Sequence, residues 1–204
     1  MAPPGAGMTK GRLEAFSDGV IAIIITIMVL ELHAPEGASL ENLQPLIPIF
    51  LSYLLSFALL GTWWNNHHHL LQAAKVIDAR VLWANLHLLF WLSLFPFGTA
   101  WVGQTTFAPI PVATYTVLLF LAGAAYYVLV RALIHAHGQP KAFAEAIGRD
   151  VKGKASSIAF AIAIPVALVA PFISMLINVG VVVMWIVPDR RMATVIRSDH
   201  PKAE

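Results

Sequence analysis

Four residues with chemical potential stand at the start of a long apolar run near the beginning of the chain. They are Arg12, Phe16, Ser17 and Asp18, and residues 20–30 after them include no charged side chain. A carboxylate is expensive in lipid unless it has a partner, so we expect Asp18 to face protein. Ionisable residues inside a membrane are candidates for function by default. The alternative is that Asp18 only fixes the packing of its helix.

The composition indicates a membrane protein with several spans. Of the 204 residues, 58% are hydrophobic and 12% are charged, whereas a soluble domain has about 25% charged residues. The mean hydropathy is +0.74. Because cysteine is absent, disulfides, thiolate metal sites and cysteine nucleophiles are excluded. The net charge of +2 gives no indication of a nucleic-acid partner.

The apolar runs predict an all-α membrane protein with six transmembrane helices. We expect a flexible N-terminus over residues 1–11, a six-helix transmembrane domain over 12–187 and a basic cytoplasmic tail over 188–204. The predicted spans are residues 12–33, 46–69, 80–103, 111–134, 155–170 and 173–187.

The last apolar region, residues 155–187, is too long for one transmembrane helix. As one helix, residues 155–187 would be about 50 Å long, against a hydrocarbon core of about 30 Å. Pro165 and Pro171 also interrupt the run. Two short spans with a tight turn near Pro171 therefore fit better.

Charge placement favours six spans. With that count all 13 Lys and Arg residues fall on one side, and the positive-inside bias places both termini in the cytoplasm. Five spans would export Arg190 and Arg191. Between the fourth and fifth spans, Phe143, Ile147 and Val151 recur every four residues, which suits a short helix on the membrane surface.

Polar residues of the first three spans are expected to lie at one depth and to supply one another with partners. They are Ser17 and Asp18, residues 65–69, and Asn85 with His87. A histidine or asparagine of the second or third span is the predicted partner of Asp18. Arg12 and Phe16 share a different helix face, where the guanidinium can cover the ring.

Three consecutive histidines, His67, His68 and His69, raise the question of a metal site. Neighbouring residues on a helix point about 100° apart, so these imidazoles are poorly placed to close around one ion. A hydrogen-bonded cluster with some pH sensitivity is the preferred interpretation, because histidine titrates near neutrality. His87 is expected to be a core histidine rather than a ligand.

An apolar line runs along the first span. Ile23, Ile27 and Leu30 stand at i, i+4 and i+7 and so lie on one side of a helix, with Asp18 roughly opposite. Periodicity alone leaves open whether this line faces lipid, other helices or a water path.

The pattern Arg12-x-x-x-Phe16-Ser17-Asp18 at the start of the first span resembles the signature of the transmembrane protein 175 family of endolysosomal and bacterial potassium channels. With one repeat, the chain resembles the bacterial members, which implies a homotetramer in the bacterial inner membrane. The resemblance implies a central pore lined by the first helix of each subunit.

Individual roles follow from the same resemblance. Ile23 would form the tightest constriction, Ile27 and Leu30 would form further rings, and Thr26 would offer a hydroxyl to a hydrated ion. Ile27 departs from the leucine common in relatives. A further set of residues is expected to brace the helix: Arg12, Phe16, Ser17, Asp18, His67, Asn85 and His87.

The expected function is a potassium-permeable cation channel with a hydrophobic gate. It is not an enzyme, needs no cofactor or metal beyond permeant K⁺, and has the lipid bilayer, monovalent cations and its own copies as partners. The chain has no Thr-Val-Gly-Tyr-Gly filter, so selectivity would come from apolar rings and gating from their wetting. Alternatives are a proton-coupled secondary transporter using Asp18 and His67–His69, an intramembrane enzyme, and a scaffold without transport.

Overall fold

The computed structural model describes residues 9–137 and 151–186, and this part of the chain is helical and without strands. The elements, in order, are α1 (Lys10–Val29), η1 (Leu40–Leu46), α2 (Ile47–Ala73), α3 (Ala79–Ser93), α4 (Phe95–Gln104), α5 (Pro109–Ala136), α7 (Val151–Val169) and α8 (Pro171–Ile186). The expected surface helix through Phe143 and Ile147, the basic tail and most of the N-terminal segment lie outside the described residues.

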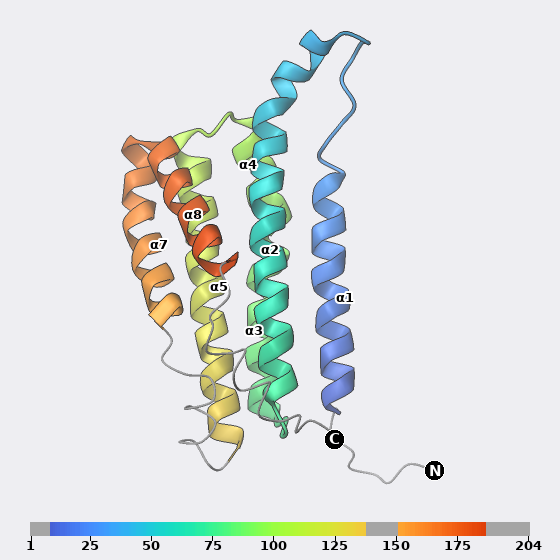
Figure 1. Cartoon of the computed structure of the whole chain (residues 1–204), viewed down its shortest axis with the longest axis vertical. Coiled ribbons are helices and arrows are strands. Elements are labelled where there is room, and N and C mark those ends of the chain that lie inside the picture. The colour runs from blue at the N-terminus through green and yellow to red at the C-terminus, as the bar shows by residue number, and fades with distance from the viewer. Residues whose placement is uncertain (1–8, 138–150, 187–204) are drawn as a thin grey trace, which may run out of the picture.

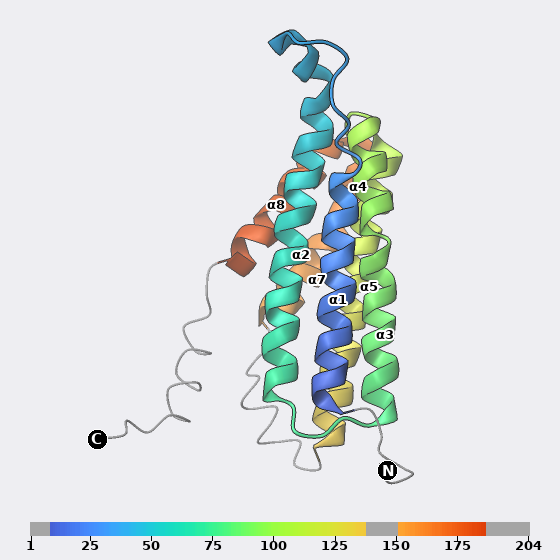
Figure 2. The ribbon, with the colours of Figure 1, turned by 90° about the vertical axis from the view of Figure 1, so that its right-hand side faces the viewer.

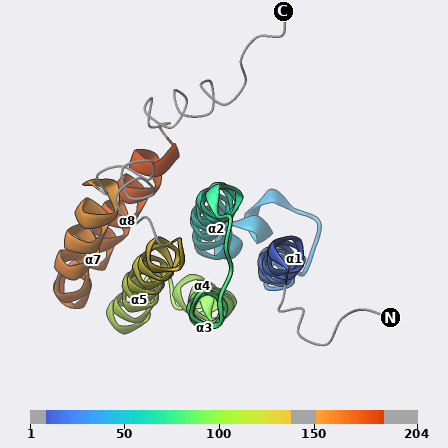
Figure 3. The ribbon, with the colours of Figure 1, turned by 90° about the horizontal axis from the view of Figure 1, so that it is seen from below.

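The helices form an elongated bundle with α1 at one edge and α7 at the other (Figure 1). Viewed along the bundle, α1 lies beside α2 and α3, while α5 separates these from α7 (Figure 3). Helix α1 packs mainly on α2, α3 and α4. Its opposite side has no neighbouring helix in front of it (Figure 2).

Four helical segments are long and apolar enough to cross a membrane: Leu40–Ala73, Ala79–Gln104, Pro109–Ala136 and Val151–Val169. Helix α8 is apolar but has only 16 residues. Helix α1 has 20 residues, among them Lys10, Arg12, Glu14 and Asp18. The predicted count of six spans therefore remains a prediction.

Prolines have different effects in the third span and in the last apolar region. The predicted helix at 80–103 is divided at Leu94, between α3 and α4, because Pro96 has no N–H and its ring clashes with the preceding turn. Sequence analysis did not predict this break. In contrast α7 continues through Pro165 and ends before Pro171, which takes the first position of α8, where a missing N–H costs nothing.

Buried polar contacts join the helices across the bundle. Thr99 Oγ1 on α4 donates to Ser56 Oγ on α2 over 2.6 Å, and Ser56 shares a 2.8 Å hydrogen bond with Tyr115 OH on α5. Asn178 Nδ2 on α8 donates to Thr116 Oγ1 on α5 over 3.0 Å. In a bilayer these bonds replace the water that the same groups would otherwise need.

Helices α2 and α4 approach closely because Gly103 has no side chain. A Cβ built at Gly103 would lie 2.6 Å from Ser52 Oγ and 2.7 Å from Ile49 Cα. Only glycine permits this distance between two backbones. The contact holds α4 against α2 above the break at Leu94.

Gly103→Ala is expected to lower the free energy of unfolding by about 1–3 kcal/mol, because the α2 backbone must shift to admit the methyl group. The matched control is Gly180→Ala, since a Cβ at Gly180 meets nothing within 4 Å. This control should be neutral or slightly stabilising. Thermal unfolding in detergent micelles measures both, and equal midpoints for the two variants would contradict the packing argument.

Candidate pore helix and its polar brace

Helix α1 has one buried and one exposed face. The buried residues are Leu13, Ser17, Ile21, Ile24 and Met28, which recur at three- and four-residue intervals and pack on α2, α3 and α4. The other face carries the apolar line, with Ile23 58%, Ile27 45% and Leu30 70% exposed. Within the described chain, the line therefore faces neither the core nor another helix.

A buried hydrogen-bonded chain anchors the inner face of α1. His67 Nε2 on α2 lies 2.7 Å from Asn85 Oδ1 on α3, and Asn85 Nδ2 donates to Ser17 Oγ over 2.9 Å. Ser17 Oγ then donates to the carbonyl oxygen of Leu13 over 2.8 Å. Because Asn85 Oδ1 can only accept, His67 Nε2 bears the proton. The three side chains are at most 1% exposed, and they tie three helices together.

Asp18 has a different partner from the one predicted. Its Oδ1 accepts a 2.9 Å hydrogen bond from Trp64 Nε1 on α2, so the expected histidine or asparagine partner was wrong. Trp64 and His67 lie one helical turn apart on α2 and reach two different helices, α1 and α3. Sequence analysis did not single out Trp64 and so gave no indication of this contact.

His67 turns away from the other two histidines, whereas the rings of His68 and His69 stay in edge contact, with their centroids 5.8 Å apart. His67 points into the core, whereas His68 shares a 2.9 Å hydrogen bond with Gln72 Nε2 and stacks on Trp64 at 5.7 Å. No group of three His, Asp or Glu residues suited to a metal ion occurs among the described residues.

His87 lies outside the brace. It is exposed and its Nε2 accepts from Trp91 Nε1 on its own helix over 2.9 Å, so the expectation of a core histidine was wrong. The physical reason is the helical turn. Two positions after the inward-facing Asn85, a side chain points to the opposite face.

Arg12 and Phe16 are also outside this brace, because both are exposed on α1. The cation–π contact within the described residues joins Lys152 to Trp185 rather than Arg12 to Phe16. The sequence prediction that both residues brace α1 is therefore not supported by a contact in this chain. They share the outward side of α1 with Ile23.

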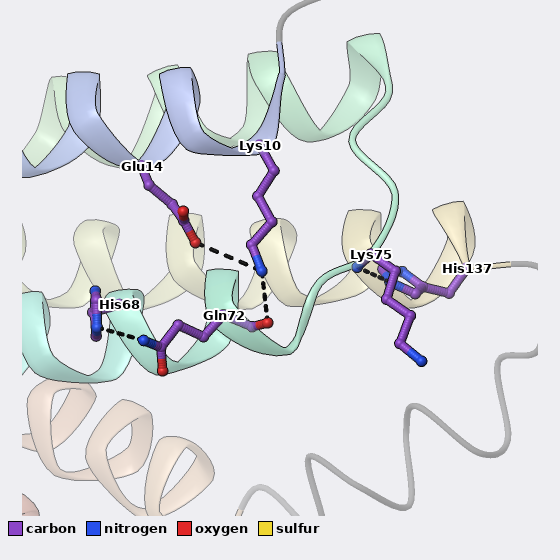
Figure 4. A network of polar contacts seen from close by, with 6 residues as sticks. All are labelled: Lys10, Glu14, His68, Gln72, Lys75 and His137. Atoms are coloured by element: carbon purple, nitrogen blue, oxygen red, sulfur yellow. Dashed lines mark hydrogen bonds and ion pairs between the residues drawn. The ribbon is translucent and has the colours of Figure 1, made fainter. Parts of the chain in front are cut away.

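Lys10 is an anchor that sequence analysis missed. Its Nζ donates to the carbonyl oxygen of Gln72 over 2.7 Å and lies 3.8 Å from Glu14 Oε1 (Figure 4). Gln72 is at the C-terminal end of α2, where carbonyl groups have no partner within the helix. Near the same end, the backbone N–H of Lys75 donates to His137 Nε2 over 2.7 Å, which fixes the α2–α3 loop to α5.

Thr26 is placed on the exposed side with the apolar line. Its hydroxyl is 2.9 Å from the Ile23 carbonyl oxygen and 3.1 Å from that of Ala22. The proton is thus used within the helix, and the oxygen lone pairs are left to face outward. An acceptor beside the exposed apolar side chains is suited to contact a cation or its water.

Comparison with known protein families and structures identifies relatives of this chain. Residues 12–96 match the family described as endosomal/lysosomal potassium channel TMEM175. A potassium channel from Chryseobacterium sp. (strain P1-3) is 49% identical over 185 residues, which cover 91% of this chain and 96% of that relative.

Two further relatives extend the comparison. The human endosomal/lysosomal proton channel TMEM175 is 36% identical over 96 residues, which cover 41% of this chain and 19% of the human protein. The crystal structure of a lysosomal potassium-selective channel TMEM175 homolog from Chamaesiphon minutus superposes with a TM-score of 0.75 at 25% identity, covering 86% of this chain and 95% of that one. The resemblance stated from the sequence motif is confirmed, and the relatives are channels rather than enzymes.

Asn85→Leu is expected to lower the free energy of unfolding by about 1–3 kcal/mol, because it leaves the buried N–H of His67 without an acceptor. Asn65→Leu is the matched control, since Asn65 is exposed on α2 and should change stability by no more than about 0.5 kcal/mol. Thermal unfolding in detergent compares them. A loss no larger in the Asn85 variant than in the control would show that the brace does not stabilise the bundle.

Trp64→Phe is expected to lower the free energy of unfolding by about 1 kcal/mol. The variant keeps an aromatic ring but removes the N–H that donates to the half-exposed carboxylate of Asp18. A double-mutant cycle with Asp18→Ala isolates the bond. The control is Trp63→Phe at the neighbouring position, where the indole makes an edge contact with Tyr126. In the Asp18→Ala background, Trp64→Phe should lower the free energy of unfolding little more than this control does. Additive losses in the cycle would mean that the Trp64–Asp18 bond contributes nothing.

Proposed function

This chain belongs to the TMEM175 family of channels, and we propose that it is a potassium-permeable cation channel whose pore is lined by α1 of each subunit. The observation that carries the proposal is the two-sided character of α1. Its inner face is hydrogen-bonded to α2 and α3, while the apolar line stays exposed. The Chryseobacterium relative, named a potassium channel, supports the choice of ion.

A pore of this kind requires several copies of the chain. One α1 helix cannot surround an opening, and soluble and membrane oligomers close by symmetry around an axis. We propose a homotetramer, the state implied by the family signature, in which four α1 helices meet with their exposed sides toward the axis. The exposed positions of Arg12 and Phe16 then bring both residues to contacts between copies rather than within one.

The apolar line supplies the filter and the gate in this proposal. Ile23 forms the narrowest ring, Ile27 and Leu30 form wider rings toward the outside, and Thr26 presents its oxygen beside Ile23. Apolar rings conduct when they are wet and close when they dewet. Cations that keep much of their water at such rings are separated by size and hydration, so discrimination between K⁺ and Na⁺ should be modest.

We place six spans in the bacterial inner membrane with both termini in the cytoplasm. Charge distribution supports this orientation. Lys10, Lys75 and Arg80 belong to the helix ends that meet at the lower end of the bundle in Figure 1, whereas Glu31, Glu36 and Glu41 belong to the connection at the other end. Short cytoplasmic loops of membrane proteins are enriched in Lys and Arg, which assigns the lower end to the cytoplasm in this proposal.

The identity of the permeant ion must be measured, because the names of the relatives give different ions. The bacterial relatives are called potassium channels and the human relative a proton channel. Reconstituted liposomes can report K⁺ efflux and H⁺ influx from the same preparation. Single-channel currents further distinguish a channel from a proton-coupled transporter that uses Asp18 and His67–His69, because a transporter gives none.

Ile23→Asn is expected to raise K⁺ flux through liposomes, because a polar ring keeps the constriction wet. A fall of about 1.4 kcal/mol in the barrier would raise the flux about tenfold. Ile162→Asn is the matched control, since Ile162 is comparably exposed but lies on α7, and its flux should equal that of the unchanged protein. Unchanged or lower flux in the Ile23 variant would contradict the proposed gate.

A further inference from the structure

A cavity of about 440 Å³ lies between α2, α5, α7 and α8, remote from α1. Its walls are mainly apolar and aromatic, formed by Leu59, Trp63, Tyr126, Phe160, Val181 and Trp185. This volume falls within the range of about 300–1,000 Å³ that is typical of ligand pockets. None of the described residues that line the cavity is acidic.

The serine and threonine hydroxyl groups of the lining donate their protons within their own helices, and Tyr126 OH donates to the Asn66 carbonyl of α2 over 3.3 Å. Thr62 Oγ1 donates to the Leu59 carbonyl, Ser157 Oγ to that of Gly153, and Ser156 Oγ to that of Lys152. Ser156 Oγ also accepts from Trp185 Nε1 over 2.9 Å. These walls therefore offer mainly apolar contact, which favours a hydrocarbon occupant.

Positive charge lies at one side of the cavity, at the start of α7. Lys154 belongs to the lining, and Lys152, two residues earlier, holds its Nζ 5.9 Å from the centre of the Trp185 ring. An apolar cavity beside two lysines is complementary to a molecule with a hydrocarbon chain and an anionic group. Basic pockets between transmembrane helices bind anionic lipid head groups by the same physics.

We propose that this cavity is a binding site for an anionic phospholipid, with an acyl chain between α2, α5, α7 and α8 and the phosphate at Lys154. The bound lipid fills space between α7 and the rest of the bundle. The site does not depend on the proposed conduction, because it uses no residue of α1.

Gly123 provides a direct way to close the site. It lines the cavity, and a Cβ built on it meets nothing within 4 Å, so a side chain added at this position begins in open space beside the cavity. The matched control is Gly180, which also has open space around its Cβ position but is absent from the lining. Gly→Leu at the two positions adds the same group to a helix.

The first experiment measures lipid retention by native mass spectrometry. The full chain is reconstituted in vesicles of equal phosphatidylglycerol and phosphatidylcholine and extracted in mild detergent. We expect the unchanged protein and Gly180→Leu to retain phosphatidylglycerol, and Gly123→Leu to retain at least about tenfold less. Equal retention by the two variants, or equal retention of both lipids by the unchanged protein, would overturn the proposal.

The second experiment tests the charge with a variant that leaves the helix contacts in place. Lys154→Gln should weaken the preference for phosphatidylglycerol about fivefold, the effect of one basic residue at a membrane surface. Lys75→Gln removes the same charge in the α2–α3 loop, away from the cavity, and should leave the preference unchanged. An equal loss of preference in both variants would show that Lys154 does not bind the phosphate and would contradict the proposed site. Ion flux does not enter either measurement, so failure here leaves the proposed channel intact.

Discussion

The need to satisfy buried polar groups without water governs this bundle. In a bilayer each such group must find a partner on its own helix or a neighbouring one. Asn85 meets this need by bonding both His67 on α2 and Ser17 on α1. The same rule joins Ser56 to Tyr115, farther along the bundle. Polar residues are few, but their bonds specify which helices are neighbours, a task that apolar packing performs poorly when lipid is equally apolar.

For α1 this constraint produces an asymmetric support. Ser17, Asp18 and Lys10 are each held by bonds to α2 or α3, and every one of these bonds lies toward the bundle. The opposite side carries Arg12, Phe16, Thr26 and the apolar line, which are exposed in this chain. A helix fixed from behind in this way can present a rigid surface to other copies of the chain. In the proposed pore this rigidity would matter, because the width of an apolar ring decides whether water fills it.

The polar residues that were predicted to lie at one depth show how much of the site can be predicted from the sequence. Spacing along a helix gives depth, and depth correctly grouped Ser17, Asn85 and His67. It did not give rotation about the helix axis, which is why His87 was assigned to the core and Trp64 was overlooked. The depth of two side chains follows from counting residues from a charged end. Their contact depends on how two whole helices are turned toward each other, and many residues share in setting that angle.

By itself the sequence determined that the chain is a helical membrane protein, because long apolar runs and scarce charges have no stable alternative. The motif around Asp18 also determined the family. Tertiary structure decided the partners: Trp64 for Asp18, Gln72 for Lys10, and an outward rather than bracing position for Arg12. It also decided that Pro96 divides a helix while Pro165 does not. These outcomes depend on packing between segments distant in the chain, which local residue patterns do not encode.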